Sequence, residues 1–286
     1  MTNNNRSDDT FHCTIAPRYT DLDTWRHVNN SRLYQMHQEA RMLAHVDRFG
    51  PNAWFSDTIR LRPLRTITAY RLVTWYGSDV QAQVRVLSCD EDTYRVRSEL
   101  YQNGEQVGSQ ECLMAAFDQG ERAALPAALV ASMQGTVTGA PEPLPAANYP
   151  ELLDAVRERG AHHQLIPRYA DLDADAQRSE AALALYMEQA RFSTIRHLDM
   201  GEAGMLIAQA DISFEHFRPD SQPVDLAAAV SRIGNTSFVF TGCASTAAGT
   251  QASANSVMVA IDKQTNRPVP LPAALRAQLE ALSIEP

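Results

Sequence analysis

The chain contains the same seven-residue phrase twice. PRYTDLD occupies residues 17–23, and PRYADLD returns at residues 167–173, an offset of 150 residues with one difference. At the same offset, QEAR at residues 38–41 aligns with EQAR at residues 188–191. A repeat this long is a whole domain, because the units of a solenoid are much shorter. The sequence therefore predicts a tandem duplication.

The 286 residues leave room for two domains of ordinary size. Residues 135–150 carry four prolines without a regular apolar period, which predicts an extended linker. We therefore expect an N-terminal domain at residues 1–134, a Pro-rich linker at 135–150 and a C-terminal domain at 151–286. A short helix is expected over residues 151–159, with Gly160 ending it in the left-handed conformation.

A long helix is predicted near the start of each copy. In the first copy, Asn29, Asn30 or Ser31 can cap a helix whose apolar residues recur at helical spacing to about residue 48. In the second copy, residues 180 to about 198 are apolar on more than one face, so this helix should be largely enclosed.

After each helix the apolar period changes to two, which indicates strands. These strands are expected at residues 80–86, 94–100, 224–230, 237–244 and 251–262. Asn103-Gly104 predicts a tight hairpin, because both central residues of that turn need positive φ. Each copy should therefore be a strand, a helix and an antiparallel meander, with the sheet wrapped around the helix in an α+β fold.

Charge and composition exclude several classes of function. The net charge of −9 disfavours nucleic acid and anionic membranes as partners. Neither an export signal nor about 18 consecutive apolar residues is present, so we expect a cytoplasmic protein that does not enter the membrane. The four cysteines form no C-x-x-C pair and the histidines show no metal-ligand spacing, so no zinc or other metal is expected. No Gly-rich phosphate loop occurs, and no cofactor is expected.

The most informative stretch is residues 21–30, DLDTWRHVNN, between the first strand and the first helix. The pattern Y-x-D-x-D-x-x-x-H-V-N-N-x-x-x-Y begins at Tyr19 and ends at Tyr34. It resembles the hotdog-fold thioesterases of the 4-hydroxybenzoyl-CoA thioesterase and acyl-ACP thioesterase type, and the duplication resembles their tandem double-hotdog members. The resemblance implies two tandem hotdog domains, each an antiparallel sheet around a central helix.

The resemblance also implies roles for individual residues. Asp23 matches the aspartate that attacks the thioester or activates water, and His27 matches the histidine of the plant-type acyl-ACP enzymes. The backbone N–H near Asn30 matches the oxyanion donor, with Asn29 shaping the helix entrance. Trp25 stands where those enzymes have a substrate-orienting asparagine.

Elementary chemistry supports the same location. Thioester hydrolysis builds negative charge on the carbonyl oxygen, and a helix N-terminus offers unpaired N–H donors at a positive dipole end. A carboxylate just before that helix can be nucleophile or general base, and the sequence does not separate the two. The alternative interpretation is that Asp23, Asn29 and Asn30 only make turns and caps. Asp21 and its counterpart Asp171 are assigned to structure.

The second copy keeps Asp173 but has Gln177, Arg178, Ser179 and Glu180 in place of HVNN. This indicates one working site and one structural remnant, with drift in a capping loop as the alternative. In paired hotdogs the loop of one unit faces the helix of the other, so the resemblance implies Glu188 as a second acid–base candidate. Glu188 could instead be an exposed charge or an ion-pair partner of Arg191.

Arginines crowd the segment after the first helix, at Arg60, Arg62, Arg65 and Arg71. Their guanidinium groups suit the phosphates of CoA or a phosphopantetheine arm, and a solvated surface is the alternative.

Together these features predict hydrolysis of an acyl-CoA or acyl-ACP to a carboxylic acid and a thiol. The acyl chain would run along the seam between the helices, and the tandem unit could form a homodimer. Two other classes remain open: hotdog enoyl-thioester hydratase or dehydratase chemistry, with His27 opposed to Glu188, and a non-catalytic acyl-binding protein.

Overall fold

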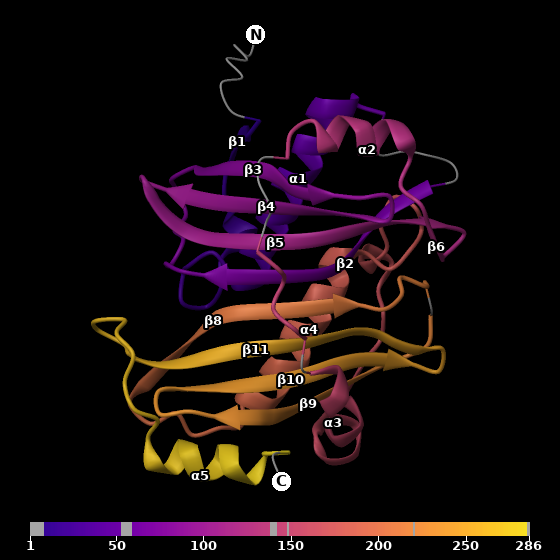
Figure 1. Ribbon diagram of the computed structural model, residues 1–286. Helices are drawn as coiled ribbons and strands as arrows, with labels where there is room; N and C mark the ends of the chain where they lie inside the picture. The colour runs from indigo at the N-terminus through magenta and orange to yellow at the C-terminus, as the bar shows by residue number, and fades with distance from the viewer. Residues whose placement is uncertain (1–8, 53–58, 138–141, 148, 220, 285–286) are drawn as a thin grey trace. The chain divides into compact units, whose positions relative to one another are not determined.

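The computed structural model describes residues 9–52, 59–137, 142–147, 149–219 and 221–284. The chain divides into two compact units, residues 1–144 and 145–286, each built of helices and antiparallel strands (Figure 1). The division falls within residues 135–150, of which 138–141 and 148 lie outside the described residues. The limits of the expected domains and linker remain a prediction.

The first unit is a five-stranded antiparallel sheet with one long helix against it. Its strands lie in the order β1-β3-β4-β5-β2, and the short β6 pairs with the end of β5. The helix α1 contacts β1, β3, β4 and β5 (Figure 1). The elements are β1 (Phe11–Ile15), the 3-10 helix η1 (Tyr19–Asp21), α1 (Asn30–Phe49), β2 (Ile59–Tyr70), β3 (Val80–Cys89), β4 (Thr93–Gln102), β5 (Glu105–Asp118), β6 (Glu121–Ala123) and α2 (Ala127–Gln134).

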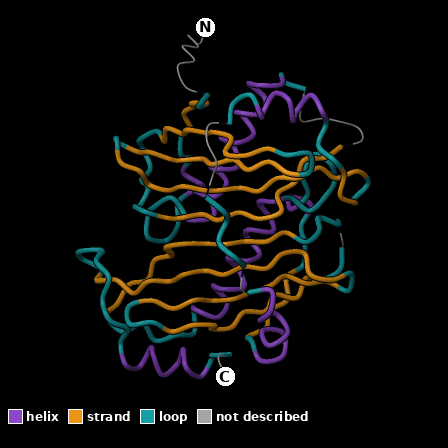
Figure 2. The backbone as a smooth tube through the Cα atoms, in the orientation of Figure 1, coloured by secondary structure: helices purple, strands orange, loops and turns teal. Residues whose placement is uncertain are grey.

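The second unit repeats this plan, as the backbone trace shows (Figure 2). Its strands lie in the order β7-β9-β10-β11-β8, and α4 contacts β7, β9, β10 and β11. The elements are the 3-10 helix η2 (Pro150–Leu152), α3 (Leu153–Arg159), β7 (Ala161–Leu165), the 3-10 helix η3 (Tyr169–Asp171), α4 (Glu180–Ile195), β8 (Ala203–Phe214), β9 (Val224–Ile233), β10 (Ser237–Thr246), β11 (Gly249–Asp262) and α5 (Ala273–Ala281).

The helix α1 begins and ends as its sequence predicts. The side chain of Asn29 caps it by accepting a hydrogen bond from the N–H of Ser31, and Gly50 ends it with a φ of 93°. Its apolar face, including Leu33 and Met36, is buried in the same cluster as the inward side chains of β3, β4 and β5. The sheet therefore holds α1 along most of its length.

The strand β2 was not predicted, although the strands that follow it were. Pro63 and three arginines interrupt its alternation, and the pairing of β2 with β5 shifts register between Pro63 and Arg65. The predicted hairpin is confirmed, because Asn103 and Gly104 both have positive φ between β4 and β5. The unit is thus a three-stranded meander, β3-β4-β5, with β2 added beyond β5 rather than a simple meander.

The glycine that ends α3 is required for a reason that the sequence analysis missed. Gly160 has φ −73° and ψ 168°, so it is extended and not left-handed as predicted. A Cβ atom at this position would lie 2.4 Å from the carbonyl oxygen of Val156 and 2.9 Å from that of Ala228. Close packing of α3 on β9 therefore excludes a side chain here.

The second unit is covered on the outer face of its sheet as well. Leu153 and Val156 of α3 pack on Ala227, Ala229 and Cys243, forming a small cluster separate from the side that faces α4. This explains why β9 is buried almost continuously instead of alternating. The helix α4 ends at Ile195, three residues before the expected end. Phe192 is its one exposed side chain, so the prediction of a largely enclosed helix is confirmed.

Candidate functional site

Residues 21–29 form a loop that closes on itself just before α1. The backbone N–H of Asp23 donates to the carbonyl of His27 at 2.8 Å, and Leu22 and Val28 form an isolated antiparallel bridge. The N–H of Asn29 donates to the carbonyl of Asp21 at 2.8 Å. These bonds fix the positions of Asp23 and His27 relative to the start of α1.

Asp21 has a structural role, as its residue type and place suggested. Its buried carboxylate accepts from the backbone N–H of Arg18 at 2.7 Å and from the Arg18 guanidinium at 2.9 Å. Asp171 makes the same contacts with Arg168 and accepts a further hydrogen bond from the hydroxyl of Tyr186 at 2.8 Å.

The two oxygens of Asp23 have different surroundings. Oδ1 accepts from the backbone N–H groups of Trp25 at 2.8 Å and His27 at 3.2 Å, which is a turn-forming role. Oδ2 lies 3.9 Å from Nδ1 of His27. The side chains of Asp23 and His27 are 28% and 18% exposed, so both reach solvent while being held in place.

The first turn of α1, which follows this pair in the chain, supplies a hydrogen-bond donor. Asn29 is the cap, and its side-chain oxygen accepts from both the N–H and the hydroxyl of Ser31. The N–H groups of Arg32 and Leu33 donate to the carbonyl of Asn29. Within the residues that the structure describes, the backbone N–H of Asn30 has no acceptor. It is therefore available at the positive end of the helix dipole.

Trp75 belongs to this neighbourhood and was missed by the sequence analysis. It lies in the loop between β2 and β3, where the carbonyl of Thr74 accepts from the N–H of Val28 at 2.8 Å. The Trp75 ring packs edge to face on the His27 ring with centroids 5.2 Å apart, and the centroid of the Trp25 ring lies 6.1 Å from that of His27. The only sequence signal was an aromatic Trp75-Tyr76 pair in a polar loop.

The second copy has the same backbone frame with different side chains. Asp173 Oδ1 accepts from the N–H groups of Asp175 and Gln177, and the N–H of Arg178 donates to the carbonyl of Phe217. The loop geometry therefore does not depend on HVNN, and Asp173 makes the turn without a neighbouring histidine.

Glu188 and the arginines belong to other elements than this loop. Glu188 is half-buried on α4 of the second unit, whereas Asp23 belongs to the first, and their pairing remains a prediction. Arg62 is buried on β2 and Arg60 is half-buried. Neither lies on the solvated surface that was the alternative for them, and their contact with a substrate phosphate also remains a prediction.

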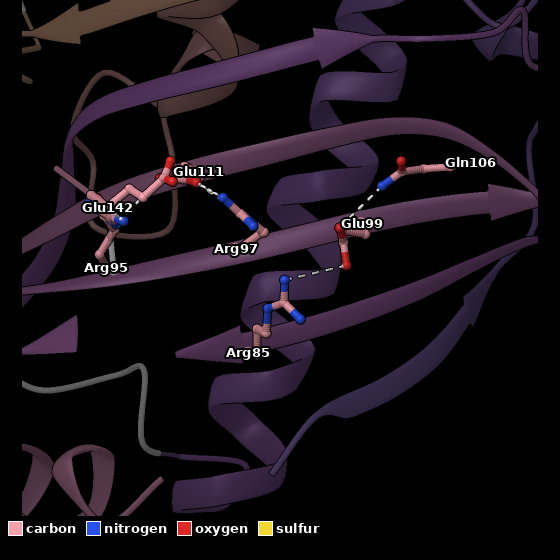
Figure 3. A network of polar contacts seen from close by, with 7 residues as sticks. All are labelled: Arg85, Arg95, Arg97, Glu99, Gln106, Glu111 and Glu142. Carbon is pink, nitrogen blue, oxygen red and sulfur yellow. Dashed lines mark hydrogen bonds and ion pairs between the residues drawn. The ribbon is translucent and has the colours of Figure 1, made fainter. Parts of the chain in front are cut away.

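More arginines lie on the outer face of the same sheet, where they are paired. Figure 3 shows Glu111 of β5 between Arg95 and Arg97 of β4, with Arg95 Nε 3.3 Å from Glu111 Oε2. Arg95 also donates to the carbonyl of Glu142 at 2.6 Å. The arginines of this face therefore pair with Glu111 of the same sheet and with the backbone at Glu142, which follows α2. The remaining residues drawn are the pair Arg85 and Glu99, with Gln106 donating to Glu99.

The cysteines are free and in part buried. Burial raises the pKa of Cys13 to about 11, so this thiol stays protonated at neutral pH. Across the described ranges, no three His, Cys, Asp or Glu side chains gather as metal ligands. In the same part of the chain, no helix combines the length and apolar character needed to span a membrane.

Comparison with known proteins gives one family and several similar folds. The family described as Thioesterase-like superfamily matches residues 17–159, half of the chain. No curated protein matches. Among solved structures, the chain is similar to the 12:0-ACP thioesterase from Umbellularia californica, with a TM-score of 0.71 and 13% identity over 88% of this chain and 94% of that one.

Two bacterial structures are similar in the same way. A putative oleoyl thioesterase from Lactobacillus plantarum has a TM-score of 0.73 and 12% identity, with 88% of this chain and 97% of that one covered. An acyl-ACP thioesterase from Bacteroides thetaiotaomicron has a TM-score of 0.61 and 9% identity, with 87% and 98% covered. At such identities the likeness shows the fold alone. It confirms the predicted α+β fold of two tandem hotdog domains.

Proposed function

Because the chain belongs to the thioesterase-like superfamily, we propose that it hydrolyses an acyl thioester of CoA or of acyl carrier protein to a carboxylic acid and a thiol. Two similar structures are acyl-ACP thioesterases by name, which supports an acyl thioester as the substrate class. We assign the reaction to the first unit, at Asp23 and His27.

One observation carries this assignment. Asp23 Oδ2 faces the imidazole of His27, while the unused N–H of Asn30 lies at the start of the helix that follows them. A carboxylate, an imidazole and a free helix-end donor are the groups that acyl transfer requires: one to attack or activate water, one to move a proton, and one to bind the oxyanion.

In the proposed reaction, the thioester carbonyl oxygen accepts the hydrogen bond from the N–H of Asn30. Asp23 Oδ2 takes a proton from water as the water attacks the carbonyl carbon, or it attacks that carbon itself to give an anhydride that water then cleaves. The C–S bond breaks, and the leaving thiolate receives a proton through His27. Either route consumes one water and yields acid and thiol.

The test compares matched aspartates in the two copies. Asp23→Asn keeps the Oδ1 acceptor of the turn but removes the charge, so we expect thiol release from a panel of acyl-CoA and acyl-ACP substrates to fall by about 10²–10⁴-fold. Asp173→Asn makes the same change in the second copy and should leave the rate near that of the wild type. Equal rates for Asp23→Asn and the wild type would remove the assignment.

Two further readouts separate the remaining alternatives. When one sample of enzyme passes through repeated single turnovers in ¹⁸O-labelled water, the label enters the carboxylate of Asp23 only if this residue is the nucleophile. Hydration of an enoyl-CoA without thiol release would replace hydrolysis with hydratase chemistry, and binding of acyl-CoA with neither reaction would leave a non-catalytic acyl-binding protein.

A further inference from the structure

Four aromatic side chains are exposed among the described residues of the first unit, and two of them contact His27. Trp25, Trp75 and Tyr76 are 47%, 51% and 54% exposed, and Tyr19 is 76% exposed. We call these four residues the aromatic rim. Exposure of several large rings together is unfavourable in water, and such groups mark binding sites.

The rings of the aromatic rim form two contacting groups, one of which includes the imidazole of the proposed site. Tyr19 packs on Tyr76 with centroids 6.3 Å apart, Trp75 packs on His27 at 5.2 Å, and His27 packs on Trp25 at 6.1 Å. Trp75 and Tyr76 are neighbours in sequence. All three ring pairs are close to perpendicular, an arrangement in which the edge of one ring meets the face of another and the rings do not stack.

The backbone beneath the rim is fixed. The buried side chain of Gln102 accepts from the N–H of Trp75 at 2.8 Å and donates to the carbonyls of Trp75 and Ser78, both at 2.8 Å. Thr74 is tied to Val28 by the backbone hydrogen bond described above. The rings are therefore exposed on a preorganised backbone, which lowers the entropy cost of binding.

The second copy shows that the fold does not require Trp25 or Trp75, although Tyr169 there is an exposed ring like Tyr19. Its backbone frame is the same, with the carbonyl of Phe217 in the place of that of Thr74. The positions equivalent to Trp25, His27 and Trp75 are Asp175, Gln177 and Arg218, all polar. An apolar cluster on one of two equivalent frames points to a ligand and not to folding.

We propose that the aromatic rim binds the apolar acyl group of the thioester and so selects substrates by the size of that group. The inference rests on the proposed function for its choice of ligand. With the carbonyl carbon at Asp23 and the leaving sulfur at His27, the groups within reach of Trp25 and Trp75 are the acyl group and the start of the pantetheine arm. Of these, the acyl group is apolar, whereas the pantetheine side carries amides that need hydrogen-bond partners.

The experiment uses the rim's own fluorescence. The chain has three tryptophans, and Trp54 lies outside the described residues, so a Trp54→Phe background leaves indoles only at Trp25 and Trp75. The probes are S-octyl-CoA, a thioether that cannot be hydrolysed, and free CoA. We expect S-octyl-CoA to change the emission and to bind at least about tenfold more tightly than CoA, as one or two good aromatic contacts provide.

Three variants in that background complete the test. Trp75→Ala should reduce the preference for S-octyl-CoA by about tenfold, and Trp75→Phe should retain most of it. Tyr169→Ala, which removes the exposed counterpart of Tyr19 in the second copy, should leave the preference unchanged. Circular dichroism checks that each variant is folded.

Two results would overturn the inference: CoA binding as tightly as S-octyl-CoA, which would place the nucleotide on the rings, or an unchanged preference in Trp75→Ala. Neither depends on turnover. Loss of the proposed function would appear as thiol release that does not need Asp23, whereas loss of this inference would appear only in the ratio of the two affinities.

Discussion

Replacing Gly160 with alanine should destabilise the second unit. The added Cβ would lie 2.4 Å from the carbonyl oxygen of Val156, where ordinary contact begins at 3.4 Å, so that oxygen or the chain must move by about 1 Å. The same oxygen accepts the N–H of Gly160 at 2.8 Å, the bond that ends α3. A second clash, with the carbonyl oxygen of Ala228 at 2.9 Å, blocks movement toward β9.

The expected magnitude combines three effects. Overpacking against backbone costs about 1–3 kcal/mol, and weakening the terminal hydrogen bond adds about 0.5–1.5 kcal/mol. Alanine also restricts the conformations of the unfolded chain, which offsets about 0.4–1 kcal/mol of this loss. The net loss in the free energy of unfolding is about 2 kcal/mol, or a fall in Tm of about 4–8 °C.

Gly135 provides the matched control, because it also ends a short helix at negative φ. A Cβ there would be no closer than 3.7 Å to its nearest neighbours, so Gly135→Ala should be neutral or stabilise by about 0.5 kcal/mol. Unfolding should be followed by far-ultraviolet circular dichroism, since all three tryptophans lie in the first unit. Equal midpoints for the two alanine variants would refute the packing argument.

Two further predictions concern buried titratable groups. Burial raises the pKa of Asp171, but hydrogen bonds from Arg168 and Tyr186 outweigh it and hold the pKa below its usual 3.8. The contribution of Asp171 to stability is therefore present above pH 4 and lost as the pH falls through its folded-state pKa. In urea unfolding, Asp171→Asn should lower the free energy of unfolding by about 1–3 kcal/mol at pH 7 and by less near pH 3. His37 is fully buried beside Ser98, at 2.8 Å from its hydroxyl, and burial, with Arg41 adding to it, lowers its pKa to about 3. In the unfolded chain His37 has its usual pKa of 6.5 and binds a proton below that pH. The free energy of unfolding of the wild type should therefore fall by up to about 1.4 kcal/mol per pH unit as the pH is lowered from 6.5 to 3. The double variant His37→Met with Ser98→Ala should flatten that slope.

The features that the sequence predicted well are local. The cap at Asn29, the end of α1 and the hairpin at Asn103-Gly104 each depend on residues close together in the chain, whose conformational preferences decide the outcome. The duplication also made each copy a check on the other. The loop of residues 21–29 was found for the same reason, because its repeated aspartates marked it.

The features that were missed depend on distant contacts. Trp75 meets His27 only because a strand and a loop bring them together, and no spacing in the sequence encodes that approach. The strand β2 was hidden because Pro63 and the arginines break its alternation while β5 supplies its pairing. Gly160 was predicted to be left-handed from its place after a helix, but its backbone is extended, and the carbonyl oxygens of Val156 and Ala228 leave no room for a Cβ atom there.

The shared frame of the two loops has a consequence for how such a chain can evolve. The turn at residues 171–179 keeps its main-chain bonds although a histidine and two asparagines have been replaced. Side chains at the equivalent of Trp25, His27 and Trp75 can therefore be exchanged in either half while the aspartate preserves the turn. The second loop can therefore acquire side chains for a new specificity while the site in the first loop keeps its own.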